Sequence, residues 1–209
     1  MRFSDIRIQH IYSVDFGNGE RCEFNNRHLA VVLKKNTDQR TLIVVPLTTS
    51  NNGLGTTKQL LGKISNLPPN LSVNDTYFVY DQVRTLNANR FYALKNNGQI
   101  HQTKLDDHLF TMILKFCSKE FVKSFNHEEK TDFYLLLSKE SICEHIVDLA
   151  YQARKSQNSS VKDEKNAKIL ELFQPDLPFS NILTPYNHSS KIMDDINLII
   201  EEEIKSKTQ

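Results

Sequence analysis

Two short polar segments carry side chains whose types and spacing suit phosphate chemistry. The first is Asn-Asn-Arg-His at residues 25–28, which follows a glycine-containing loop and leads into an apolar run. Its guanidinium, at Arg27, is well placed to meet a phosphate, because arginine offers several N–H donors to phosphate oxygens. The second is Asp-Gln-Val-Arg-Thr at residues 81–85, at the end of a candidate strand. If this segment is extended, Gln82 and Arg84 point to the same face.

Threonine hydroxyls are expected beside the first segment. Thr48 and Thr49 follow the apolar run at residues 41–47, so a hydroxyl should lie near Arg27 if the two apolar runs are central strands of one sheet. The pattern also has a plainer interpretation, in which a strand-end arginine forms a surface ion pair with a carboxylate. His28 likewise has two interpretations, a packed structural histidine or a titratable group of a site.

The motif content argues against several enzyme classes. The chain has no glycine-rich nucleotide-binding loop, no His-Glu-x-x-His motif and no Gly-x-Ser-x-Gly motif. Its seven histidines and three cysteines form no Cys-x-x-Cys pair and no pair at metal-ligand spacing. We therefore expect no metal, no cofactor and no disulfide framework. Unpaired thiols fit a reducing cytoplasm.

The composition is that of a soluble globular protein, with 39% hydrophobic and 24% charged residues and a mean hydropathy of −0.47. The strongest apolar run, residues 42–47, is far shorter than the roughly 18 residues of a membrane span. The first ten residues lack the apolar stretch of a secretory signal. These features predict a cytoplasmic protein with no membrane partner. The length allows one domain, or a small domain with an appendage.

The net charge of +1 conceals an asymmetry between the two halves of the chain. Residues 1–100 hold 12 Lys and Arg against 7 Asp and Glu, whereas residues 101–209 hold 14 against 18. A basic N-terminal half is compatible with a phosphate-bearing partner. Ordinary scatter among solvated charges explains the same numbers.

The N-terminal half predicts β structure and the C-terminal half predicts helices. Short strands separated by turns are expected at residues 8–16, 28–33, 41–47, 59–64 and 76–80, and this spacing favours a compact β-barrel. After about residue 104 the apolar residues follow a helical period. Asp106 or Asp107 is the expected N-cap of a helix that should bury one stripe, made of Leu109, Ile113, Leu114, Phe116, Cys117 and Phe121. Further helices are expected at residues 128–137, 140–154, 162–173 and 190–205.

Four segments, in this order and spacing, resemble the MazF/PemK family of toxin endoribonucleases over residues 6–120. They are Ile-Tyr-Ser-Val-Asp-Phe-Gly at 11–17, Arg-His-Leu-Ala-Val-Val-Leu at 27–33, Ile-Val-Val-Pro-Leu-Thr-Thr-Ser at 43–50, and Tyr-Asp-Gln-Val-Arg-Thr-Leu at 80–86 followed by Arg90. The resemblance implies an α+β fold, with an SH3-like small β-barrel and its C-terminal helix in residues 1–120. Residues 121–209 would form a mainly α-helical extension of unknown role.

The resemblance also implies a function. Such a protein is the toxin of a type II toxin-antitoxin system, is usually a homodimer, and has a protein antitoxin as partner. It cleaves single-stranded RNA, including mRNA, without a metal, and leaves 2′,3′-cyclic phosphate and 5′-hydroxyl ends. Arg27 and Thr48 match the catalytic positions of the family. The residues that match or adjoin RNA-contacting positions are Gln82, Arg84, Thr85, Thr49, His28 and Asn18.

The sequence departs from the family pattern at three places. His28 replaces the proline that follows the catalytic arginine, the loop at 17–26 is not rich in small polar residues, and about 90 acidic-rich residues follow the core. A non-catalytic module that binds RNA or protein is therefore an alternative to a ribonuclease. The extension either packs as ordinary amphipathic helices or covers the RNA groove through acidic residues such as those at 201–203.

Overall fold

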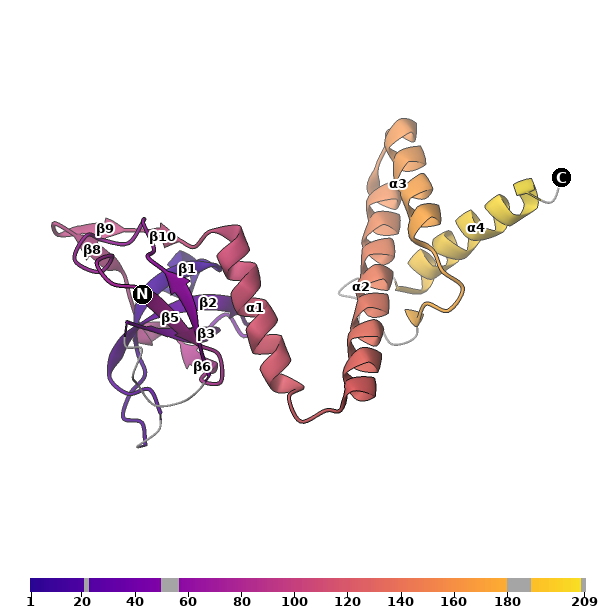
Figure 1. The fold of residues 1–209 in the computed structure, drawn as a ribbon. Coiled ribbons are helices and arrows are strands. Elements are labelled where there is room, and N and C mark those ends of the chain that lie inside the picture. The colour runs from indigo at the N-terminus through magenta and orange to yellow at the C-terminus, as the bar shows by residue number, and fades with distance from the viewer. Residues whose placement is uncertain (21–22, 50–56, 180–188, 208–209) are drawn as a thin grey trace. The chain divides into compact units, whose positions relative to one another are not determined.

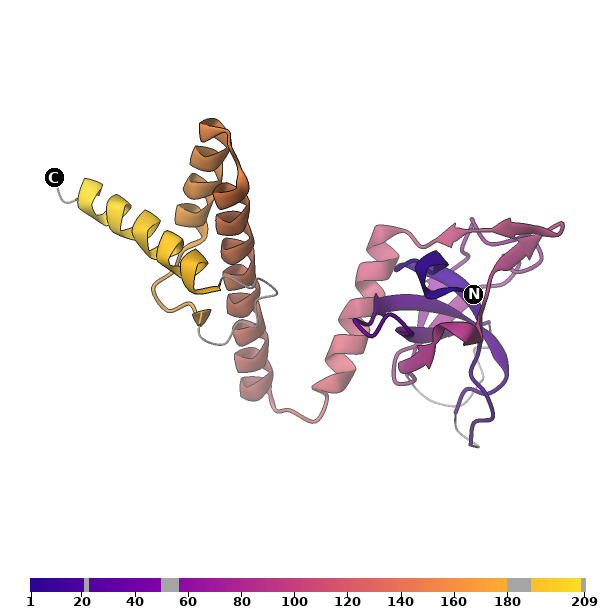
Figure 2. The same ribbon diagram turned by 180° about the vertical axis from the view of Figure 1, so that it is seen from behind.

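The protein is seen here as a computed structural model that describes residues 1–20, 23–49, 57–179 and 189–207. Its chain divides into two compact units, Met1–Ser124 and Phe125–Gln209. The first unit is mainly β-sheet and the second is entirely helical in its described elements (Figures 1 and 2).

The first unit is built on an antiparallel sheet. Its strands are β1 (His10–Asp15), β2 (Arg27–Lys35), β3 (Thr41–Thr48), β4 (Lys58–Gly62), β5 (Thr76–Val79), β6 (Arg84–Asn87), β7 (Phe91–Tyr92), β8 (Leu94–Asn96), β9 (Gln99–His101) and β10 (Thr103–Lys104), with 3-10 turns at Phe3–Asp5 and Ala88–Arg90. The main order is β10-β1-β2-β3-β5-β4, with β6 also on β3 and β7 on β1, while β8 and β9 form a separate hairpin. The predicted α+β class, a small β domain followed by helices, is confirmed, but no pairing among the described strands joins β10 to β4, so the sheet is not closed.

The two central strands read as unbroken apolar runs because both of their faces are covered. Val31 of β2 and Val45 of β3 belong to a helix-side cluster, which also contains Leu47, Phe78 and buried residues of the following helix. The alternate residues Ala30, Val32, Leu42 and Val44 belong to an N-terminal-side cluster, which also contains Ile6, Val14, Phe16 and Phe91. Burial on both sides fixes the register of β2 and β3, since a slip of one residue would exchange the two faces.

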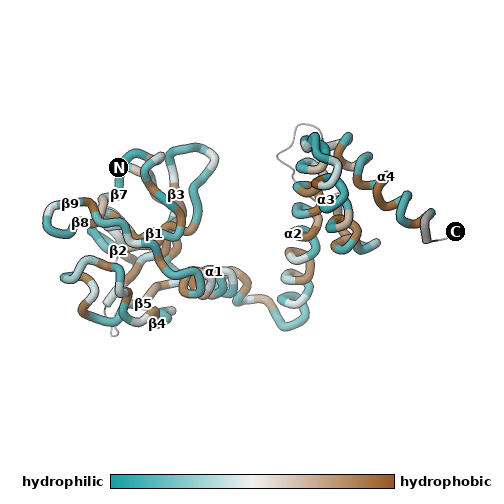
Figure 3. The backbone as a smooth tube through the Cα atoms, turned by 90° about the horizontal axis from the view of Figure 1, so that it is seen from above, coloured by the Kyte–Doolittle hydropathy of each residue, from teal (hydrophilic) through white to brown (hydrophobic). Residues whose placement is uncertain are grey.

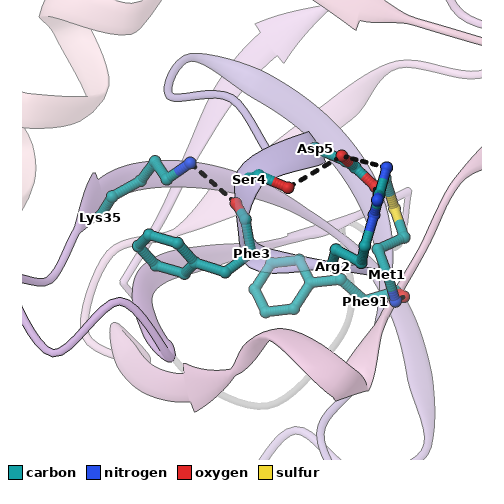
Figure 4. A network of polar contacts seen from close by, with 7 residues as sticks. All are labelled: Met1, Arg2, Phe3, Ser4, Asp5, Lys35 and Phe91. Atoms are coloured by element: carbon teal, nitrogen blue, oxygen red, sulfur yellow. Dashed lines mark hydrogen bonds and ion pairs between the residues drawn. The ribbon is translucent and has the colours of Figure 1, made fainter.

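The N-terminal segment packs on the second of these clusters through Phe3 and Ile6, and Figure 4 shows the polar contacts around it. Lys35 Nζ donates hydrogen bonds to the carbonyl oxygens of Phe3 and Ile6, both at 2.8 Å. The same ammonium lies 4.3 Å from the centre of the Phe3 ring. The amino group of Met1 donates to the Phe91 carbonyl at 3.0 Å. These contacts hold the segment against β2 and the strand that follows the second 3-10 turn.

Helix α1 (Asp107–Phe121) closes the first unit over the helix-side cluster. Asp106 is the N-cap residue, as predicted, but its side chain makes no capping hydrogen bond. The start of the helix is tied to the sheet by Gln9, whose Nε2 donates to Asp107 Oδ1 at 2.5 Å and to the Leu105 carbonyl at 2.8 Å. That hydrogen bond and the nearby Lys104 ammonium lower the pKa of the Asp107 carboxyl.

The predicted apolar stripe of α1 is only partly correct. Ile113 and Cys117 are buried, and burial raises the pKa of the Cys117 thiol to about 11, so it stays protonated near neutral pH. Phe121, however, is 73% exposed and Leu114 is 39% exposed. The helical period places Phe121 on the correct side, but it lies in the last turn, where the described chain offers it no packed neighbour.

The second unit contains α2 (His127–Lys155), α3 (Ser159–Leu172) and α4 (Ser189–Lys207). The prediction of separate helices at 128–137 and 140–154 is wrong, because α2 is continuous over 29 residues. Neither Ser138 nor Lys139 breaks a helix as glycine or proline would. A capping box starts α2, in which Asn126 Oδ1 accepts from the Glu129 N–H at 2.9 Å and Glu129 Oε2 accepts from the Asn126 N–H at 2.8 Å.

The core of the second unit lies around the later part of α2. Its buried members include Cys143, Ile146, Ile169, Ile192 and Ile196, which come from all three helices. Apolar residues recur along these helices, as the brown segments of Figure 3 show. In the earlier part of α2, by contrast, residues 134–137 are all exposed although they are Tyr-Leu-Leu-Leu. None of the described helices is long and apolar enough to cross a membrane.

Candidate functional site

A pocket of about 380 Å³ opens where β2 begins and β3 ends. Because the strands are antiparallel neighbours, with Leu29 opposite Leu47, residues 27–28 of one strand lie beside residues 48–49 at the end of the other. These strand ends form the first wall of the pocket, and the segment between β4 and β5, with the first residue of β5, forms the second wall. The lining residues are Arg27, His28, Leu29, Leu47, Thr48, Thr49, Asn70, Leu71, Val73, Asn74 and Thr76. The structure therefore brings Arg27, Thr48, Thr49 and His28 together, as the sequence predicted for the arginine and a threonine.

Arg27 presents an exposed guanidinium at this pocket. Its Cζ lies 3.7 Å from the centre of the Tyr92 ring, a cation–π contact. Asp15 is its partner across β1 and β2, but Asp15 Oδ1 accepts a hydrogen bond from the Gly17 N–H at 2.8 Å. Within the described part of the chain, no ion pair or hydrogen bond engages the Arg27 guanidinium, so its N–H donors face solvent and can meet an anion.

Tyr92 was not predicted from the sequence as part of the site. It comes from β7, which pairs with β1 so that Ser13 lies opposite Tyr92, while Asp15 lies opposite Arg27. Residues 13 and 15 of β1 point to the same face of the sheet. The phenol ring and the guanidinium thus meet diagonally across one strand, and this pairing of β7 with β1 has no local signal in the sequence.

His28 packs among aromatic rings. Its ring centre lies 4.9 Å from that of Phe24 and 6.4 Å from that of Phe16, both in edge-to-face geometry. Those two phenylalanines also contact each other, at 5.8 Å. These contacts favour the structural interpretation of His28, although the residue also contributes to the pocket lining.

Arg84 and its neighbours lie outside the pocket lining. Arg84 forms an ion pair with Glu23 at 3.2 Å and donates to the Phe24 carbonyl at 3.3 Å and to Gln82 Oε1 at 3.4 Å. The side chains of Gln82 and Arg84 therefore lie on the same side of this segment, as expected. A partly exposed ion pair of this kind contributes about 0–1 kcal/mol, but these contacts tie the end of the β1–β2 loop to β6.

Two further candidates are solvent-exposed and also lie outside the pocket lining. Thr85 is opposite Ile43 where β6 pairs with β3. Asn18 lies on the β1–β2 loop. Across the described ranges, no group of three or more His, Cys, Asp or Glu side chains could hold a metal ion.

The second wall of the pocket was also missed by sequence reasoning. It contributes Asn70, Leu71, Val73, Asn74 and Thr76. The Leu67-Pro68-Pro69-Asn70 segment has the composition of a loop, but nothing in the sequence indicates that this loop faces Arg27.

Comparisons with known proteins place this arrangement in a family. Residues 7–115 match the model of the PemK-like, MazF-like toxin of type II toxin-antitoxin systems, whereas no curated protein matches the chain. Two similar solved structures are an endoribonuclease in complex with its cognate antitoxin from a Mycobacterial species (15% identity, TM-score 0.37, covering 55% of this chain and 92% of that one) and MazF from Deinococcus radiodurans (16%, 0.39, 56% and 96%). Because the family model spans more than half of the sequence, the protein belongs to the PemK-like, MazF-like toxins.

Proposed function

We propose that this toxin is a metal-independent endoribonuclease that cleaves single-stranded RNA, including mRNA. The observation that carries the proposal is the convergence of Arg27 and Thr48 on one pocket, in a chain whose family consists of toxins of toxin-antitoxin systems. An exposed arginine without a carboxylate partner among the described residues is suited to bind a phosphate of an incoming RNA strand.

In the proposed reaction the nucleophile is the RNA 2′-hydroxyl. Its oxygen forms a bond to the adjacent phosphorus, the bond from phosphorus to the 5′-oxygen of the next nucleotide breaks, and the proton lost by the 2′-hydroxyl is balanced by one gained at the 5′-oxygen. The products carry 2′,3′-cyclic phosphate and 5′-hydroxyl ends. DNA is not a substrate because it lacks the nucleophile.

Arg27 and Thr48 take complementary roles in this reaction. The non-bridging oxygens gain negative charge in the pentacoordinate transition state, and guanidinium N–H groups stabilise that charge. Arginine stays protonated at physiological pH, so Arg27 is not the general base. The Thr48 hydroxyl donates a hydrogen bond to the phosphate or to a bridging oxygen, and Thr49 provides a second hydroxyl in the same pocket.

The other predicted RNA contacts are assigned supporting roles. Arg84 and Gln82 hold the end of the β1–β2 loop, through the contacts to Glu23 and Phe24 described above. Thr85 and Asn18 offer exposed polar groups to a strand that continues beyond the pocket. His28 packs against Phe24 and Phe16 next to the pocket.

The family also supports the proposed partners. A toxin of a type II system is held inactive by a protein antitoxin, so we propose a cognate antitoxin as partner, and a homodimer as the active form. We assign the RNA chemistry to residues 1–120 and leave residues 121–209 as the helical extension.

The test is incubation of the purified full-length chain with a single-stranded RNA in EDTA, followed by analysis of the new ends. We expect 5′-hydroxyl and 2′,3′-cyclic phosphate ends, with a DNA strand of the same sequence left intact. Binding of the RNA without any cleavage would support the non-catalytic module instead. Cleavage that EDTA abolishes would contradict metal independence.

Tyr92 provides a second test of the same site. Tyr92→Ala removes the ring on which the Arg27 guanidinium lies, and an exposed cation–π contact of about 0.5–1 kcal/mol corresponds to a roughly 2- to 5-fold lower kcat. Tyr92→Phe keeps the ring face and should restore most of the rate. Tyr134→Ala on α2 is the matched control, because Tyr134 is 37% exposed and Tyr92 is 39% exposed. Equal kcat values for Tyr92→Ala and the wild type would show that the ring does not position Arg27.

A further inference from the structure

Two asparagine side chains line the pocket on the wall that faces the β2 and β3 ends. Asn70 and Asn74 lie in the segment between β4 and β5, and both are exposed. No described residue makes a hydrogen bond with either side-chain amide. Each amide therefore has an N–H₂ donor group and a carbonyl acceptor available to a ligand.

The backbone that carries Asn70 is fixed in place. The Leu71 and Ser72 N–H groups both donate to the Pro68 carbonyl, at 2.8 and 3.1 Å, and Ser72 Oγ donates to the Pro69 carbonyl at 3.2 Å. These bonds close a turn that begins at Pro68 and presents Asn70. The fixed φ angles of Pro68 and Pro69 stiffen this turn further.

The same segment is anchored to the sheet and to the core. Asn66 Nδ2 donates to the Lys104 carbonyl at 2.6 Å, and the Asn66 carbonyl accepts from Thr103 Oγ1 at 3.0 Å. Leu67 is buried, and Leu71 packs against the helix-side cluster. A ligand that binds beside Asn70 therefore meets a backbone that is already ordered, so less entropy is lost on binding there.

The two walls of the pocket carry different kinds of side chain. Arg27 and the two threonines lie on the first wall, and the amides lie on the second. Leu29, Leu47 and Leu71 supply apolar surface. Among the described lining residues Arg27 is the single permanently charged side chain, and there is no carboxylate. These features suit a ligand that has one anionic group, a flat apolar face and a polar but uncharged edge.

We propose that this pocket is a nucleobase-binding recess, in which the base next to the cleaved phosphate has its edge read by Asn70 and Asn74. The base lies against the leucine side chains while its phosphate meets Arg27. Side-chain amides discriminate among bases because each base edge has its own order of donors and acceptors, and bases of single-stranded RNA can be splayed out to expose that edge. A volume of about 380 Å³ is within the range of small-ligand pockets. The inference rests on the proposed function for the identity of the ligand as RNA.

The experiment uses short RNAs that are identical except for one of the four bases at each position beside the mapped cleavage site. We expect the full-length wild type to prefer one base at one of these positions by about 10- to 100-fold in kcat/KM. Asn70→Ala and Asn74→Ala should each reduce that preference at least several-fold, and the double variant should abolish it. Asn96→Ala in the β8–β9 hairpin is the matched control and should keep the wild-type preference.

A second measurement separates this inference from the proposed function. The same RNAs, carrying a 2′-deoxy nucleotide at the cleaved position, are titrated in fluorescence anisotropy, and unfolding midpoints confirm that each variant is folded. Cleavage that persists with an unchanged base preference in the folded double variant would overturn the recess and leave the ribonuclease intact. A preference in binding that the double variant loses, without cleavage by the wild type, would support the recess and contradict the cleavage activity.

Discussion

Arg27→Ala is expected to lower the rate of RNA cleavage by about 10²- to 10³-fold, which corresponds to about 3–4 kcal/mol of lost transition-state stabilisation. The guanidinium lies in the pocket with no described ion-pair partner, so its donors are available to the developing charge on phosphorus oxygens. Removing it leaves the Thr48 and Thr49 hydroxyls in that wall of the pocket. The measurement is single-turnover cleavage of RNA with the enzyme in excess, which separates the chemical step from product release.

Two variants control for charge and for folding. Arg27→Lys keeps the positive charge but loses the planar fork of donors, so its rate should lie between those of the wild type and Arg27→Ala. Arg40→Ala removes an exposed arginine that lies in the β2–β3 turn, outside the pocket, and should leave the rate unchanged. Because Arg27 is exposed and its Tyr92 contact is a surface cation–π contact, its loss should change the free energy of unfolding by no more than about 1 kcal/mol. An Arg27→Ala rate within a few-fold of the wild type would remove Arg27 from the catalytic centre.

The central strands could be predicted from the sequence because burial on both faces produces an unmistakable pattern. Residues 28–33 and 41–47 are nearly continuous apolar runs, and they became the middle of β2 and β3. Their antiparallel pairing, continued from Leu29 opposite Leu47, brings residues 27–28 beside residues 48–49, with Thr49 opposite Arg27 and Thr48 opposite His28. The strands between residues 91 and 104 were not predicted, since β7 and β10 have two residues each and β8 and β9 have three. Strands of two or three residues are too short to show an alternation of apolar and polar side chains.

The helical part shows what a local pattern cannot decide. The prediction ended one helix before Ser138 and began another after Lys139, yet these two polar residues do not interrupt α2. Phe121 follows the apolar period of α1 and is nonetheless largely exposed. Period identifies the side of a helix on which a residue lies, but burial depends on whether another element reaches that turn.

The missed site residues share one property, which is distance along the chain from the residues they accompany. Tyr92 reaches Arg27 through the pairing of β7 with β1, and Asn70 and Asn74 reach the pocket because their segment is anchored through Asn66 to the β10 strand. Each of these contacts depends on a tertiary pairing rather than on a motif. A signal for them could have come only from knowing which loops surround the strand ends.

The origin of the nucleophile is the feature of the mechanism with the largest expected effect. In the proposed mechanism an intramolecular 2′-hydroxyl attacks the adjacent phosphorus, and such proximity is equivalent to effective concentrations of about 10⁵ M or more. Replacing that hydroxyl by hydrogen at the cleaved nucleotide leaves only water as an attacking group. The same RNA with the 2′-deoxy nucleotide placed elsewhere keeps the nucleophile and serves as the control.

The most direct measurement is therefore the rate at which the full-length protein cleaves these two RNAs at the mapped site. The proposed mechanism predicts that the RNA with the deoxy nucleotide at the cleaved position is not cut there, with a rate lower by about 10⁵-fold or more, while the control is cut at the wild-type rate. Cleavage of both RNAs at the same site and at similar rates would contradict the mechanism, because the attacking group would then not be the 2′-hydroxyl.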